Sequence, residues 1–179
     1  MATSVHHIAL ACRDPEETHR FYGDVLGLRL IHTEIQSKDD TWVRHFFYDL
    51  GDGSCLAFFE LHNAGEPPVL QTAISTGLGL PVWVNHLALR RSLDELPGIK
   101  ERLLAHGIEP AMELDHGWCQ SLYYEDPNGI LVEFCTTTKA LTDDDRKDAE
   151  RLFADPQPPV MPPPDAKFFR APARTGAPA

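Results

Sequence analysis

The chain has 179 residues, 42% of them hydrophobic and 24% charged, which is enough to bury the core of one domain or of two small modules. Its formal net charge of -11 disfavours nucleic acid as a partner, because phosphates would be repelled. No apolar run approaches the roughly 20 residues that span a bilayer, and the first residues lack a signal-peptide pattern, so we expect a cytoplasmic protein with no membrane partner.

The first predicted elements form a βαβββ module over residues 4–63. An apolar strand, VHHIAL (5–10), is followed by a helical segment in which Asp14 can cap the first turn and Pro15 can occupy the first helical position. The segment WVRHFFYDLGDGSCLAFFEL (42–61) then reads as strands joined by a GDG hairpin turn.

The same pattern returns over residues 83–137, after a proline- and glycine-containing linker at 64–82. The strand VNHLAL (84–89) repeats VHHIAL at a distance of 79 positions, and the helix SLDELPGIKERLLAHGI (92–108) ends at Gly107. Strands within MELDHGWCQSLYYEDPNGILVEF (112–134) are joined by a DPNG turn. The fold class predicted from these elements is therefore α+β, built from two tandem βαβββ modules.

The C-terminal tail, residues 138–179, differs from both modules. Thr142 and Asp145 have the spacing of a capping box that opens a short helix, and a proline-rich stretch follows. A stretch of this composition cannot form a core, so we expect it to wrap the surface or to stay mobile. A homodimer with this tail at its interface is one arrangement left open.

Each repeated strand carries a histidine on a face of small residues. His7 shares its face with Ala9, and His86 shares its face with Ala88, because side chains alternate along a strand. A hydrogen-bonded core histidine is the alternative interpretation of either one alone. Glu133 lies within the apolar strand GILVEFC, where a buried carboxylate needs a cation. Two matched histidines and this carboxylate predict a metal site.

The stretches VHHIALACRDPEETHRFYGDVLGL, VNHLAL and YYEDPNGILVEF resemble the vicinal oxygen chelate superfamily over about residues 4–137. That superfamily includes glyoxalase I, extradiol ring-cleaving dioxygenases, and bleomycin- and fosfomycin-resistance proteins. The resemblance implies that the modules form an open, cup-shaped, eight-stranded mixed sheet around a divalent metal. It also implies His7, His86 and Glu133 as the metal ligands.

The resemblance leaves two kinds of enzyme open, which differ at the end of the first module. A glyoxalase-I-like lyase or isomerase using Ni or Zn would add Glu60 as a fourth ligand. However, superposing the GDG turn on the PNG turn places Ala57, not Glu60, opposite Glu133. Without Glu60, two histidines and one carboxylate form the facial set associated with Fe(II) and dioxygen.

A second stretch, DHGWCQSLYYEDPNG, favours the dioxygenase. Ser121 and Tyr123 match an S-x-Y that extradiol enzymes of this superfamily carry ten residues before the final glutamate. By resemblance, Tyr123 would bond a substrate oxygen and His116 would transfer a proton; a packed aromatic and a loop histidine are the alternative interpretations. Phe47 and Trp118 could line an aromatic substrate pocket with Ser121, although aromatic residues in strands more often only pack.

The sequence therefore predicts an Fe(II) extradiol-type dioxygenase that cleaves a catecholic or related vicinal-oxygen aromatic small molecule with O2. Ni, Zn or Mn are the alternative metals. A lyase of the glyoxalase type is the first alternative, and a ligand-binding protein like the bleomycin-resistance members is the second.

Overall fold

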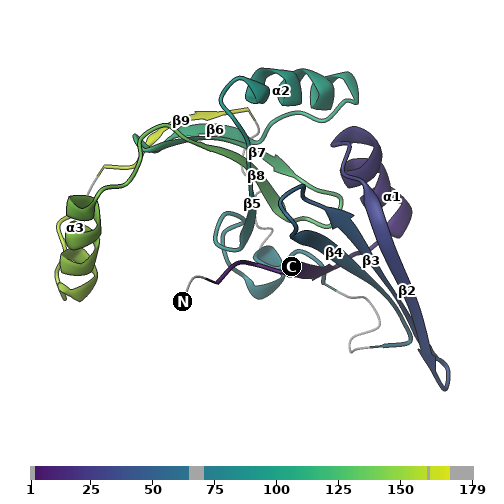
Figure 1. Cartoon of the computed structure of the whole chain (residues 1–179). Helices are drawn as coiled ribbons and strands as arrows, with labels where there is room; N and C mark the ends of the chain where they lie inside the picture. Colours follow the sequence, from purple (N-terminus) through teal and green to yellow (C-terminus); the bar gives the residue numbers. More distant parts are fainter. Residues whose placement is uncertain (1–2, 65–70, 161, 170–179) are drawn as a thin grey trace, which may run out of the picture.

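The computed structural model describes residues 3–64, 71–160 and 162–169 (Figure 1). The first module contains two helical segments, α1 (Pro15–His19) and a π-helical continuation (Arg20–Val25), and the strands β1 (His7–Ala11), β2 (Leu30–Lys38), β3 (Thr41–Asp49) and β4 (Cys55–His62). A short 3-10 turn (Thr76–Leu78) leads into the second module. That module contains β5 (His86–Arg90), α2 (Glu95–Ala105), β6 (Met112–Asp115), β7 (Cys119–Glu125) and β8 (Leu131–Thr137), and the tail adds α3 (Asp143–Ala154) and β9 (Asp165–Phe168).

The strands form two sheets with the same order. Sheet A runs β1-β4-β3-β2 and sheet B runs β5-β8-β7-β6-β9, with the first pair of each sheet parallel and the others antiparallel. The α+β class and the tandem βαβββ modules are thus confirmed. The eight module strands do not join into one sheet, because within the described chain the modules meet through their cores rather than by pairing of edge strands.

Local sequence signals explain where the first helix begins and how the last hairpin turns. The Asp14 carboxylate accepts hydrogen bonds from the backbone N–H groups of Glu16 (2.8 Å) and Glu17 (3.1 Å), and proline takes the first helical position. In the DPNG turn, Gly129 has a φ of 76°, and a Cβ at this position would lie 2.8 Å from the Cβ of Ala73. Both the backbone conformation and the lack of space therefore require glycine.

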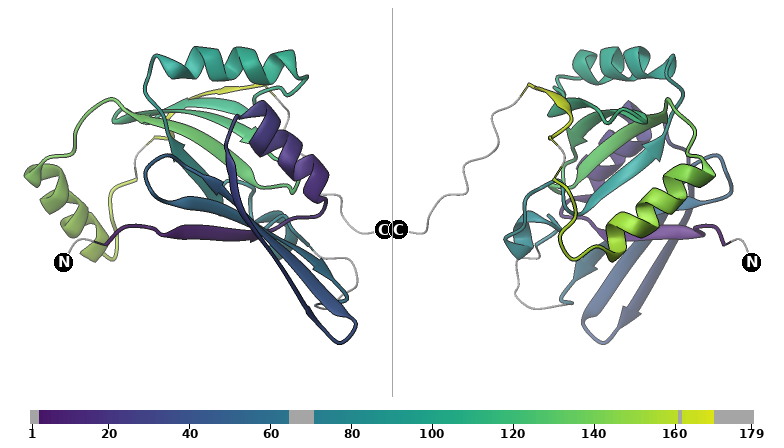
Figure 2. Two further views of the ribbon diagram at one scale, coloured as in Figure 1. Left: turned by 45° about the vertical axis from the view of Figure 1, so that its right-hand side comes forward. Right: turned by 90° about the vertical axis from the view of Figure 1, so that its left-hand side faces the viewer.

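One continuous core joins the two modules. The helix-facing side of each sheet supplies its large apolar residues, including Phe46, Tyr48, Leu56 and Phe58 from sheet A and Leu122, Tyr124, Val132 and Phe134 from sheet B. The two helices α1 and α2 lie on this same side (Figure 2). The opposite face of sheet A carries His7, and the opposite face of sheet B carries His86 and Glu133.

In the tail, the structure describes a short helix and a strand, and an interface of the tail with a partner subunit stays a prediction. The capping box is confirmed, since the N–H of Thr142 donates to the Asp145 carboxylate (2.8 Å) and the N–H of Asp145 donates to the Thr142 hydroxyl (3.3 Å). The strand β9 pairs antiparallel with β6 of its own chain. The helix α3 projects from the body and buries none of its residues (Figure 1). The rest of the tail, 170–179, and part of the linker, 65–70, lie outside the described residues.

Across the described ranges, none of the helices combines the length and the apolar character that crossing a bilayer requires.

Candidate metal centre

Two of the three predicted ligands meet on sheet B. Glu133 is the register partner of Ala88, so His86 and Glu133 lie on one face of neighbouring strands β5 and β8. The Nε2 atom of His86 lies 2.9 Å from Oε2 of Glu133, whose side chain is only 6% exposed. The sequence expectation that these two residues converge agrees with this placement.

The imidazole of His86 is held in a defined tautomer. Its Nδ1 lies 2.8 Å from the carbonyl oxygen of Trp83, so Nδ1 must carry the hydrogen that it donates. In the neutral ring the Nε2 lone pair then faces the Glu133 carboxylate, and only a proton or a metal ion between them makes that contact attractive. Metal-bound histidines typically donate their other N–H to a carbonyl in this way.

The spacing of the two atoms also fits a shared ion. Two donor atoms that occupy adjacent octahedral positions at about 2.1 Å from the ion lie about 3.0 Å apart. The 2.9 Å between Nε2 of His86 and Oε2 of Glu133 matches that geometry. Imidazole nitrogen and carboxylate oxygen are ligands that Fe(II), Mn, Ni and Zn all accept, so the pair fits a divalent transition metal without choosing among them.

Neighbouring polar groups orient the carboxylate and surround it. The hydroxyl of Ser121 donates to Oε1 of Glu133 at 2.5 Å, which leaves Oε2 for the ion. Tyr123 is the direct cross-strand partner of Glu133 and is 5% exposed. Its hydroxyl lies 3.2 Å from Nε2 of His116. Burial, and then the negative charge of Glu133, raise the pKa of Tyr123 well above its ordinary value, so the phenol remains a hydrogen-bond donor.

The third predicted ligand, His7, lies on sheet A. Its ring contacts Phe47, with the ring centroids 5.7 Å apart, and its Nδ1 lies 2.8 Å from Nδ1 of His6. Throughout residues 3–64, 71–160 and 162–169, no three histidine, cysteine, aspartate or glutamate side chains lie close enough together to hold one metal ion. The single chain therefore brings His86 and Glu133 together but does not add His7, whose role stays a prediction.

The register of sheet A decides the position of Glu60. Ala57 pairs with Ala9 of β1 as Glu133 pairs with Ala88 of β5, so Ala57 is the structural counterpart of Glu133. Glu60 is three residues further along β4 and therefore faces the other side of the sheet from His7. There its carboxylate contacts Nε2 of His62 (2.7 Å) and Nε of Arg44 (3.3 Å). This placement gives no support to a fourth ligand at Glu60.

The residues predicted to line the substrate pocket are divided between the sheets. Phe47 lies beside His7 on sheet A, whereas Ser121 lies on β7 of sheet B. Trp118 lies in the turn just before β7 and is 43% exposed. The sequence assigned no role to His45, whose Nε2 is buried and has no hydrogen-bond partner in the part of the chain that the structure describes. Its ring stacks on Phe59 at 3.7 Å. Burial lowers the pKa of His45, so its imidazole is neutral near pH 7.

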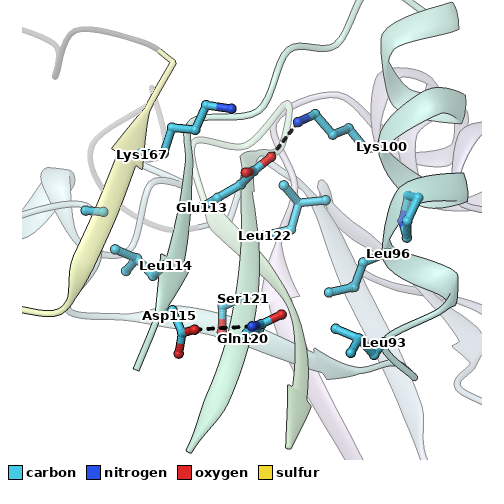
Figure 3. A pocket seen from close by; sticks show the side chains of 12 residues that line it. Leu93, Leu96, Lys100, Glu113, Leu114, Asp115, Gln120, Ser121, Leu122 and Lys167 are labelled. Carbon is cyan, nitrogen blue, oxygen red and sulfur yellow. Dashed lines mark hydrogen bonds and ion pairs between the residues drawn. The ribbon is translucent and has the colours of Figure 1, made fainter. Parts of the chain in front are cut away.

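A groove of about 710 Å³ lies between α2 and strands β6, β7 and β9 (Figure 3). Leu96 and Leu122 line its apolar part, and the ion pair of Lys100 and Glu113 spans its rim. Neither His86 nor Glu133 lines this groove. The candidate metal centre therefore lies outside this groove and is recognised by its donor atoms.

The model of the Glyoxalase/Bleomycin resistance protein/Dioxygenase superfamily matches residues 4–134. A Bacillus subtilis (strain 168) protein, MhqE, whose name assigns it provisionally to the ring-cleaving dioxygenases, is 38% identical over 68 residues, which are 36% of this chain and 22% of that protein. Biphenyl-2,3-diol 1,2-dioxygenase 2 of Rhodococcus globerulus is 35% identical over 95 residues, 50% of this chain and 47% of that protein. The chain thus spans less than half the length of either relative.

Among solved structures, a point mutant of the fosfomycin resistance protein FosX from Listeria monocytogenes superposes with a TM-score of 0.53 and 22% identity. The match covers 82% of this chain and 99% of that one. That crystal contains Mn(II) and 1S,2S-dihydroxypropylphosphonic acid. At this level of identity the likeness demonstrates a shared fold.

Proposed function

Because the chain belongs to the glyoxalase/bleomycin resistance protein/dioxygenase superfamily, we propose that it is a metal-dependent enzyme, an Fe(II) extradiol-type dioxygenase that cleaves a catecholic or related vicinal-oxygen aromatic substrate with O2. The observation that carries the proposal is the pair of His86 Nε2 and Glu133 Oε2, 2.9 Å apart, with the other imidazole nitrogen already bonded to a carbonyl. The two relatives named for ring cleavage favour this reaction class, and the Mn(II) complex of FosX favours a divalent ion at the site.

The proposed centre is completed by a second copy of the chain. His7 is exposed on the face of sheet A that the common core leaves uncovered, and His86 with Glu133 occupies the corresponding face of sheet B. In a twofold dimer, His7 of each copy would approach His86 and Glu133 of the other, which gives two equal sites. Trp83, 60% exposed, and Trp118, 43% exposed, offer apolar surface for such a contact.

The donor set defines what the ion would contribute. Two histidines and one carboxylate leave adjacent positions free, and Fe(II) bound there would bring the substrate's vicinal oxygens and O2 together and exchange electrons with both. Glu133 is fixed for this task by the Ser121 hydroxyl. His86 is fixed by the Trp83 carbonyl. Both ligands are therefore oriented before the ion arrives, which reduces the cost of ordering them.

Tyr123 and His116 act on the substrate in this proposal. The raised pKa of Tyr123 keeps its hydroxyl protonated, so Oη donates a hydrogen bond to a substrate oxygen. Before substrate binds, this hydroxyl can donate to an unprotonated Nε2 of His116, 3.2 Å away. Once Nε2 has taken the proton that a catechol releases on binding, its N–H donates to Oη instead, which frees the Tyr123 hydrogen for the substrate oxygen, and His116 later returns the proton to the product. Phe47 and Trp118 supply apolar surface for the aromatic ring. Holding the substrate and these side chains in one site removes much of the entropic cost of bringing the reacting groups together.

Oxygen consumption tests the reaction. Protein loaded anaerobically with Fe(II) is mixed with a panel of catechols in an oxygen-electrode cell, and the expected result is O2 uptake with a yellow ring-fission product. Elemental analysis of protein purified without chelators identifies the native metal. Absence of O2 uptake across the panel, together with isomerisation of the methylglyoxal–glutathione hemithioacetal by Ni- or Zn-loaded protein, would replace the dioxygenase by a lyase. Absence of both activities and of bound metal would leave a ligand-binding protein.

A further inference from the structure

The two repeated histidines keep their Nδ1 atoms in different surroundings. In the second module, Nδ1 of His86 donates to the carbonyl of Trp83, three residues earlier. In the first module, Nδ1 of His7 lies 2.8 Å from Nδ1 of the preceding residue, His6, and the two rings meet edge to face at a centroid distance of 5.1 Å. Nδ1 of His7 therefore contacts a ring nitrogen, whereas Nδ1 of His86 contacts a backbone carbonyl oxygen.

The backbone explains how neighbouring residues can make this contact. His6 precedes the first residue of β1, so its side chain is not bound to the strict alternation of the strand. The carbonyl of His6 accepts a hydrogen bond from the N–H of Cys55 at 3.0 Å, which fixes the backbone against β4. The ring of His7 also meets that of Phe47 edge to face, at a centroid distance of 5.7 Å. The imidazole of His7 thus has both His6 and Phe47 as neighbours.

We propose that His6 is a positioning residue for His7, accepting a hydrogen bond from Nδ1–H of His7 and so directing its Nε2 lone pair towards the metal. A neutral imidazole that binds a metal through Nε2 must carry its hydrogen on Nδ1. The 2.8 Å contact then requires Nδ1 of His6 to be unprotonated and its own hydrogen to be on Nε2. This inference rests on the proposed metal centre, because it concerns the orientation of one of its ligands.

The repeat explains why only one module uses a histidine for this purpose. The counterpart of His6 is Asn85, whose backbone N–H donates to the hydroxyl of Ser75 (2.8 Å) and whose side chain donates to the carbonyl of Ile74 (3.2 Å). Asn85 therefore fastens the segment that leads into β5. Because the Trp83 carbonyl already serves His86, position 85 is free for that structural task.

Three substitutions at position 6 test the inference by metal affinity. His6→Ala removes the acceptor, His6→Phe removes it while keeping the bulk of the ring, and His6→Asn replaces Nδ1 by an amide oxygen at the same branch point. The probe is Co(II), titrated anaerobically into full-length protein and followed by its visible absorption bands and by calorimetry. Loss of such an outer partner weakens metal binding by about 10- to 100-fold. We expect this loss for the alanine and phenylalanine variants and wild-type affinity within about 3-fold for the asparagine variant.

Controls separate the possible failures. His106→Ala, at the end of α2, removes a histidine that lies outside the centre and should leave Co(II) affinity unchanged. Thermal melts monitor the folding of every variant. If wild-type protein binds Co(II) and all three position-6 variants bind it equally well, or if asparagine loses as much affinity as alanine, His6 is not the acceptor. If the wild-type protein does not bind Co(II), the proposed metal centre is wrong, and His6 then has no metal ligand to orient.

Discussion

Asn128, in the DPNG turn of the second module, is predicted to fasten the two modules together. Its side chain is buried, with the residue 2% exposed. Its Oδ1 accepts a hydrogen bond from the backbone N–H of Arg13 (2.9 Å), and its Nδ2 donates to the hydroxyl of Thr18 (3.2 Å) and to Oδ2 of Asp126 (3.0 Å). Arg13 and Thr18 lie at the start of the first module's helical segment, far from Asn128 in sequence. Asn128 is thus a cross-link between the halves.

Replacing Asn128 by alanine should destabilise the protein because it removes all three of these side-chain hydrogen bonds. The N–H of Arg13 loses its acceptor and the buried carboxylate of Asp126 loses one donor. Asp126 keeps the hydrogen bonds from the Tyr22 hydroxyl and from the backbone N–H groups of residues 128 and 130, so the cost is that of the lost hydrogen bonds. Three hydrogen bonds at about 1 kcal/mol each lower the free energy of unfolding by about 3 kcal/mol. For a chain of this size each kcal/mol changes Tm by about 2–4 °C, which predicts a decrease of about 6–12 °C.

Urea denaturation and thermal melts followed by far-ultraviolet circular dichroism measure this change. Gln36→Ala, on the exposed strand β2, is the matched control and should stay within about 0.5 kcal/mol of wild type. Asn128→Asp keeps an acceptor for the Arg13 N–H but places a second carboxylate beside Asp126, so it should also destabilise. A loss below about 0.5 kcal/mol for Asn128→Ala would refute the view that this turn joins the modules.

Three further predictions concern the centre and the core. Tyr123→Phe should lower kcat for ring cleavage by about 100-fold, in the range found when a hydrogen-bond donor to a reacting oxygen is removed, with metal content unchanged; loss of metal in elemental analysis would contradict the role given to its hydroxyl. Ser121→Ala should weaken Co(II) binding by about 10-fold because Glu133 loses its orienting donor, and unchanged affinity in the same titration would count against that contact. Burial raises the pKa of Asp126, so the folded state retains this proton to higher pH than the unfolded state. Its contribution to the free energy of unfolding should therefore fall as pH rises above about 4, and Asp126→Asn should flatten that part of the pH profile measured by urea denaturation.

The repeat in the sequence was sufficient to predict most of the local geometry. Alternation along VNHLAL placed His86 on a face with Ala88, and the predicted metal site required Glu133 to converge on it; the structure has the donor atoms of His86 and Glu133 2.9 Å apart. The superposition of the hairpin turns placed Ala57 opposite Glu133, and the register of β1 with β4 and β5 with β8 confirms it. These features depend on neighbouring strands within one module, which hydrophobic periodicity and turn residues specify directly.

The assembly of the modules could not be predicted in the same way. A pattern of apolar residues specifies which face of a sheet is buried, but not whether it packs against its own chain or another. The expectation that duplication alone brings His7 to His86 therefore had no local signal to support it. The strand β9 was missed because four residues, DAKF, within a proline-rich tail carry no periodicity of their own. The contact of Trp83 with His86 involves a backbone carbonyl, which any residue possesses.

The shared metal centre is tested most directly by a heterodimer of two defective chains. His7→Ala and His86→Ala proteins are given different affinity tags, co-expressed, and purified through both tags, and Co(II) binding is measured by calorimetry. If His7 of one copy completes the site of the other, each homodimer variant loses both sites, whereas the heterodimer regains one intact site and binds about one Co(II) with wild-type affinity. A heterodimer that binds no better than either variant alone would contradict a centre built from two copies of this chain.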